Sequence, residues 1–86
     1  MRLEHSPSSD AAYVSVVDEI PDGAVDHTEN VSRGRQYERG IDYDARGAIL
    51  GYEFLNVSRG VDLSDLPHRD ELAELFERQS IRVFAS

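Results

Sequence analysis

The clearest pattern in this chain is an alternation of apolar and polar residues between positions 39 and 61. Residues 41–44 alternate apolar and acidic side chains, and residues 50–54 alternate large apolar side chains with Gly51 and Glu53. A period of two is typical of strands with one buried face. We therefore expect two strands here. The side chains predicted on the buried face are Tyr43, Leu50, Tyr52 and Phe54.

The segment between these two strands, Asp44-Ala45-Arg46-Gly47, has the composition of a hairpin turn. The carboxylate of Asp44 can accept hydrogen bonds from the backbone of the turn, and Gly47 can adopt a left-handed conformation at little cost. We expect a hairpin with a bulge at Gly47. A slip of one residue would bury Asp42 and Glu53, so the pairing register should be firm.

Three further strands are predicted before this hairpin. They cover Arg2–His5, Ala11–Val17 and Val25–Val31, and clusters of Pro, Ser, Asp and Gly separate them. The second is rich in β-branched residues, which favour a pleated surface. The third is more polar, which is typical of an edge strand.

A helix is predicted from Pro67 to Gln79, followed by a last short strand. Leu72, Leu75 and Phe76 recur at the three-and-four spacing of an apolar helix stripe. Pro67 suits the first helical turn. Residues 81–84 are apolar but too few to stand alone, so they must pair with a sheet edge in this chain or in a partner.

These elements predict an α+β fold in a single domain of residues 1–86. Residues 1–61 would form a small antiparallel β-meander of four or five strands, and residues 62–86 would supply one helix, packed on one face of the sheet, and the short C-terminal strand. The residues expected to form the core or fix the backbone are Tyr13, Tyr43, Gly47, Leu50, Gly51, Tyr52, Phe54, Leu72, Leu75 and Phe76.

Composition narrows the possible functions. The chain has 17 acidic and 9 basic residues, a net charge of -8, which argues against binding to nucleic acid or to an anionic membrane and favours basic partners. It contains no cysteine, which excludes disulfides and thiolate metal sites. No stretch approaches the roughly 20 apolar residues of a membrane span, so a cytoplasmic location is expected. A domain this small has a thin core, so we also expect a homodimer.

The pentapeptide Asn-Val-Ser-Arg-Gly occurs twice, at 30–34 and at 56–60, each time where a predicted strand ends. Two Arg-Gly loops could gather Arg33, Arg35 and Arg59 around an anion. Asn, Ser and Gly are also common where strands end, so the repeat has a purely structural interpretation, which we favour.

No catalytic or metal-binding motif stands out. His5, His27 and His68 lie far apart and lack metal-ligand spacing. A metal site would have to be assembled by folding, for example from His5, Asp10 and Asp42. We favour the interpretation that the histidines are ordinary surface or hydrogen-bonded residues. The carboxylates of the hairpin are explained by its turn and by a solvated strand face. We predict no enzyme activity, no metal and no cofactor.

Three segments carry a resemblance to a known family: Asp10–Val14, Gly40–Gly47 and Ile49–Leu55. In this order and spacing they resemble the bacterial family called domain of unknown function 2283, over about the first two thirds of the chain. That family usually opens with Tyr-Asp before its proline, where this chain has His5-Ser6. The resemblance implies a small meander sheet and no assigned activity. Some members are similar in gene context to antitoxins, encoded beside small basic proteins.

The functional expectation is therefore a non-catalytic protein-binding module, possible partners being a second copy of the chain and a small basic protein in an antitoxin-like pair. The alternative is a small-molecule or anion-binding protein that uses the Arg-Gly loops.

Overall fold

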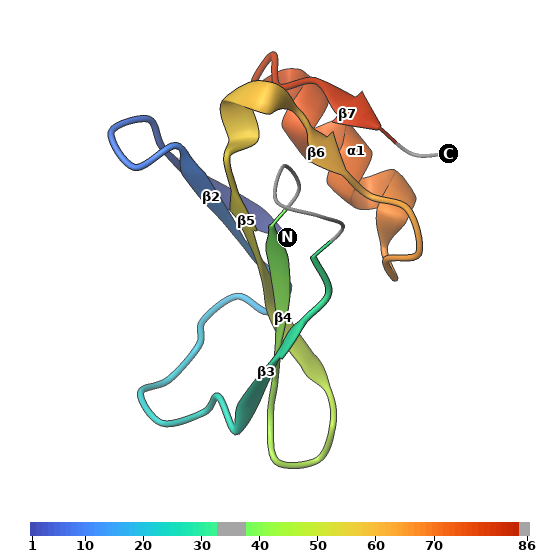
Figure 1. Ribbon diagram of the computed structural model, residues 1–86. Helices are drawn as coiled ribbons and strands as arrows, with labels where there is room; N and C mark the ends of the chain where they lie inside the picture. Colours follow the sequence, from blue (N-terminus) through green and yellow to red (C-terminus); the bar gives the residue numbers. More distant parts are fainter. Residues whose placement is uncertain (33–37, 85–86) are drawn as a thin grey trace.

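The computed structural model describes residues 1–32 and 38–84, which form a five-stranded sheet, a two-stranded sheet and one α-helix (Figure 1). The large sheet contains β1 (Arg2–Ser6), β2 (Ala11–Ser15), β3 (His27–Asn30), β4 (Arg39–Tyr43) and β5 (Ile49–Leu55). A 3₁₀ turn η1 (Val57–Arg59), strand β6 (Val61–Asp62), helix α1 (Arg69–Arg78) and strand β7 (Val83–Phe84) follow. The predicted α+β fold is confirmed.

The large sheet is antiparallel throughout, in the order β1-β2-β5-β4-β3. Strands β3, β4 and β5 form a meander, and β3 lies at the edge as its polarity predicted. The hairpin β1–β2 joins this meander at β5 and not at β3. Residues 16–26 therefore carry the chain from β2 to the opposite edge, and Figure 1 shows this connection passing round one end of the strands.

The central hairpin β4–β5 is built as the turn residues predicted. Oδ1 of Asp44 accepts hydrogen bonds from the backbone N–H groups of Arg46 and Ala48, at 2.8 and 2.9 Å. Gly47 has φ +84°, a left-handed conformation that side chains disfavour. The ladder also shifts by one residue between Asp42 and Tyr43. These features set which face of β5 meets the core.

The core lies between one face of the large sheet and the helix. Tyr52 and Phe54 of β5 are fully buried, as are Leu72 and Phe76 of α1. The rings of Phe54 and Phe76 meet edge to face, with their centroids 4.9 Å apart. Leu75 is only partly buried, so the helix presents a narrower stripe than its sequence spacing predicted.

The C-terminal strand pairs within its own chain. β7 runs parallel to β6, with Val83 opposite Val61. The Phe84 ring covers Gly60, where an added Cβ would lie 2.5 Å from a ring carbon. The sequence left open whether this strand pairs within its own chain or with a partner. In this structure it pairs with β6, a two-residue strand that the sequence did not predict.

The helix begins at Arg69, within two residues of the predicted start, after the left-handed residue His68 (φ 62°). An ion pair between Glu74 and Arg78, one helical turn apart, lies on the exposed surface of the helix.

Candidate functional site

The sheet has a second face, opposite the helix, which we call the open face. Alternation and register place on it the side chains of Glu4, Tyr13, Thr28, Asp42 and Glu53, together with Gly51. Glu4, Thr28 and Glu53 are exposed to solvent. The open face is therefore polar and acidic, whereas the opposite face of the central strands β2 and β5 is buried and mostly apolar, with Ala12, Val14, Tyr52 and Phe54 in the core.

A hydrogen-bonded row crosses the open face over four strands. The Tyr13 hydroxyl of β2 donates to Oδ2 of Asp42 in β4 at 2.7 Å, and the Thr28 hydroxyl of β3 donates to Oδ1 at 2.5 Å. The Tyr13 side chain passes directly over Gly51 of β5, where an added Cβ would lie 2.2 Å from its hydroxyl oxygen. Gly51 is thus required by this crossing.

The tyrosine in this row is held in its neutral form. Burial raises the pKa of Tyr13 above its usual value, and the hydrogen bond to the Asp42 carboxylate raises it further. The hydroxyl consequently remains a donor at neutral pH. Tyr13 was predicted to form the core or fix the backbone; it lies half-buried on the open face, where its hydroxyl bonds Asp42 across the sheet.

A hollow of about 250 Å³ opens on this face beside Tyr13. Glu4 of β1 and Glu53 of β5 line it, together with residues of the β1–β2 hairpin, Ser6 and Ala11 among them. Glu4 and Glu53 both lie opposite Tyr13 in the register, one on each neighbouring strand. Arg2 makes an exposed ion pair with Glu4 at 3.2 Å, a contact that contributes little in water. Two carboxylates and an aromatic ring therefore surround one concavity.

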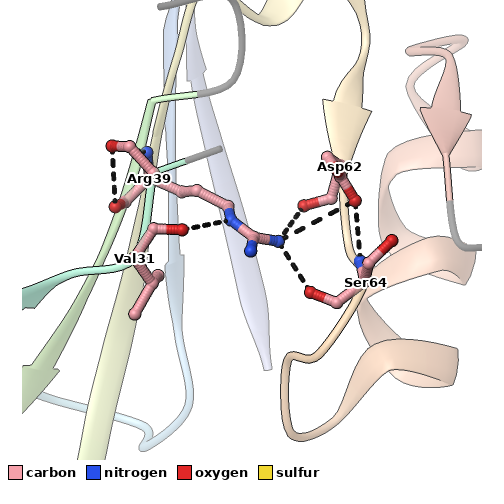
Figure 2. Close-up of polar contacts among 5 residues, drawn as sticks. Val31, Arg39, Asp62 and Ser64 are labelled. Carbon is pink, nitrogen blue, oxygen red and sulfur yellow. Dashed lines mark hydrogen bonds and ion pairs between the residues drawn. The ribbon is translucent and has the colours of Figure 1, made fainter. Parts of the chain in front are cut away.

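On the helix side of the sheet, Arg39 ties three segments together (Figure 2). Its Nε donates to the carbonyl of Val31 at 2.8 Å, and its Nη1 donates to the carbonyls of Ser64, at 2.9 Å, and Asp62. The carboxylate of Asp62 lies 4.0 Å from the same nitrogen. The arginine is only 6% exposed, so these contacts form in a dry environment where each is stronger than in water.

Arg39 thereby anchors β6 and the segment that leads to the helix onto the sheet. Sequence analysis did not single it out as a structural residue. Its position in the sequence could have indicated this role. Arg39 lies two residues before Ile41 in β4, so its side chain lies on the same face of the sheet, toward the core.

Of the three arginines considered as candidates for anion binding, Arg59 is exposed in η1, while Arg33 and Arg35 lie outside the described residues. The two copies of the pentapeptide have different local structures where they can be compared. Asn30 ends β3 and its side chain accepts the N–H of Ser32 at 2.9 Å, whereas Asn56 is left-handed, with φ 58°. Both copies begin where a strand ends, as their composition predicted.

The histidines lie in three separate environments. His27 stacks on Tyr43, with ring centroids 5.1 Å apart. Nδ1 of His68 lies 2.9 Å from the hydroxyl of Tyr52, whose pKa is raised by burial to about 12. His5 is exposed on β1. Across residues 1–32 and 38–84, no three His, Asp or Glu side chains are arranged to hold a metal ion.

Comparison with known protein families, with curated proteins and with solved structures finds no match for this chain. The resemblance to domain of unknown function 2283 therefore stays a prediction. In the part of the chain that the structure describes, no helix has the length and apolar character needed to cross a membrane.

Proposed function

We propose that this protein is a non-catalytic binding module that holds a basic protein partner on its open face. The observation that carries the proposal is the hollow between Glu4 and Glu53 beside the Tyr13 ring. A guanidinium or ammonium group placed there would meet two carboxylates and an aromatic side chain. Charge-assisted hydrogen bonds and cation–π contact both favour such a group.

The charge of the whole chain supports the same kind of partner. A net charge of -8 attracts a basic protein over distances longer than a contact and raises its association rate. The row formed by Tyr13, Asp42 and Thr28 keeps the surface beside the hollow in one arrangement. Less side-chain ordering is then needed when a partner binds, which favours affinity.

The expected partner is a small basic protein in an antitoxin-like pair in the cytoplasm, as gene context in the resembled family suggests. This proposal rests on the resemblance and on the acidic surface together.

The test is a binding titration of the product of the adjacent gene, if that product is small and basic, against the wild type and Glu4→Gln/Glu53→Gln. We expect the double variant to lose about tenfold in affinity, equivalent to about 1.4 kcal/mol. The matched control, Glu19→Gln/Glu77→Gln, removes the same charge from exposed residues outside the hollow and should change affinity less than twofold. Equal losses in both variants would leave only a general charge effect and would reject the hollow as the binding site.

Salt dependence provides a second measurement on the same pair of proteins. Raising the ionic strength from low to physiological shortens the screening length to about 8 Å, so association should weaken. An affinity that does not respond to salt would contradict an electrostatic interface.

A further inference from the structure

A second concavity, of about 600 Å³, lies where three loops meet. The turn between β1 and β2, the 3₁₀ turn η1 and the loop between α1 and β7 form its walls. Its polar lining includes His5, Asp10, Ser58, Arg59, Gln79 and Arg82. Two arginines and a histidine thus face one cavity in a chain whose net charge is -8.

The only carboxylate among the residues that line this cavity is already engaged. Oδ1 of Asp10 accepts the backbone N–H of Ser58 at 2.8 Å, and Oδ2 accepts the Ser58 hydroxyl at 2.7 Å. The hydroxyl bond lowers the pKa of Asp10, and nearby His5 and Arg59 lower it further. Asp10 therefore stays ionised and offsets one arginine. With Arg59 and Arg82 counted at +2 and Asp10 at -1, the lining keeps a charge of +1 before His5 is protonated.

The backbone holds the two arginines near each other. The N–H of Val61, two residues after Arg59, donates to the carbonyl of Arg82 at 2.9 Å. Gly60, between them, approaches so closely that an added Cβ would lie 3.3 Å from that carbonyl oxygen. The third wall is fixed by Asp10, whose carbonyl accepts the N–H of Val57 at 3.1 Å. The cavity is therefore built on connected backbone before any ligand arrives, which lowers the ordering cost of binding.

We propose that this cavity binds a small molecule that carries a phosphate group, through the guanidinium groups of Arg59 and Arg82. Planar guanidinium donors match the oxygens of a phosphate better than a point charge does. The side chains of His5 and Gln79 add donors at the same walls. The volume of about 600 Å³ lies within the usual range of about 300–1,000 Å³ for small-molecule sites.

The net charge makes this cavity distinctive. An acidic chain repels anions over most of its surface, so weak anion binding at random positions is disfavoured. Changes in amide resonances that are confined to the residues of this cavity would for that reason indicate anion binding at the cavity. His5 lines both this cavity and the open-face hollow, but Arg59 and Arg82 line only this cavity, so variants of these two arginines test the present proposal alone.

The first experiment titrates the full chain with pyrophosphate, with inorganic phosphate and with ribose 5-phosphate, and follows amide resonances by NMR. Sodium chloride of matched ionic strength is the control. We expect shifts centred on residues 57–60 and 79–82 that saturate with each phosphate probe. A larger response to ribose 5-phosphate would identify the ligand as a phosphate ester, and equal responses would identify the phosphate group alone as what the cavity recognises. Shifts no different from those in sodium chloride would overturn the proposal.

The second experiment repeats the titration with Arg59→Gln/Arg82→Gln and with a matched control, Arg46→Gln/Arg69→Gln, which removes two exposed arginines outside the cavity. The cavity variant should bind pyrophosphate at least tenfold more weakly, and the control should stay within twofold of the wild type. All four arginines are exposed, so both variants should keep the wild-type fold, which their amide spectra check directly. Equal weakening in the two variants would also overturn the proposal.

Discussion

At the scale of single residues, Arg39 shows how a charged side chain can belong to a core. Its guanidinium has little access to water, and its partners include the carbonyls of Val31, Asp62 and Ser64 and the carboxylate of Asp62. A buried charge is tolerated only with such partners. The arrangement adds hydrogen bonds from the sheet to the apolar burial of Val61 and Leu63, and both hold β6 in place.

The first prediction concerns this arginine. Arg39→Met keeps much of the side-chain volume but removes every donor, which leaves buried carbonyls unsatisfied. We expect the free energy of unfolding to fall by about 3 kcal/mol, since each unsatisfied buried group costs about 1–3 kcal/mol and the acceptors can partly relax. Urea denaturation followed by circular dichroism measures the change.

The control for this prediction is Arg46→Met in the exposed turn between β4 and β5. It makes the same chemical change where solvent reaches the side chain, so a loss below about 0.5 kcal/mol is expected. Similar losses at both positions would show that the contacts of Arg39 do not stabilise the fold.

At the scale of elements, α1 packs on the sheet through a core that includes one edge-to-face aromatic contact. Phe54 is 1% exposed and meets Phe76 edge to face. We predict that Phe54→Ala lowers the free energy of unfolding by about 3–5 kcal/mol, the usual cost of truncating a buried aromatic side chain. Leu75→Ala removes a partly buried side chain from the same interface, and about 1 kcal/mol is expected there. A small, equal loss in both variants would mean that the helix is not docked through Phe54.

The hairpin β4–β5 was predictable because all of its determinants are local. Alternation set its faces, and Asp44 and Gly47 set its turn. The pairing of β2 with β5 is a long-range contact, and nothing in the intervening residues distinguishes it from pairing with β3. β6 has two residues, too few to show a period, so the partner of β7 could not be predicted either.

The candidate sites likewise divide into parts set by local sequence, which were predictable, and parts set by long-range contacts, which were not. Glu53 and Asp42 were placed on one face of the sheet by alternation alone. The inclusion of Glu4 in the hollow depended on the strand order, which the sequence did not determine. The cavity of Arg59 and Arg82 is formed by three loops that are distant in the chain. Loops carry no periodic pattern of apolar residues, so the sequence does not indicate which loops lie close together. The pentapeptide repeat drew attention to Arg59 but offered no indication of Arg82.

At the scale of the whole molecule, size limits stability. A single core in 86 residues buries only about 60–65% of the surface of the unfolded chain. Strands β1 and β3 end the large sheet, and edge strands are where sheets of two chains can join. These features keep a homodimer as a proposal, although β7 already has a partner within the chain.

The last prediction tests that homodimer through the C-terminal segment. An exchange between two protomers would reproduce in trans the contacts that β7 makes here, the pairing of Val83 with Val61 and the packing of Phe84 on Gly60. Such a two-fold exchange buries the same surface on each protomer. Light scattering at micromolar concentration should then give twice the chain mass of 9.7 kDa for the full chain. Deleting residues 81–86 should restore the mass of a monomer. The melting temperature should fall on deletion in either case, because β6 loses its partner, so only the mass discriminates. A full-length chain that scatters as a monomer would end the proposal.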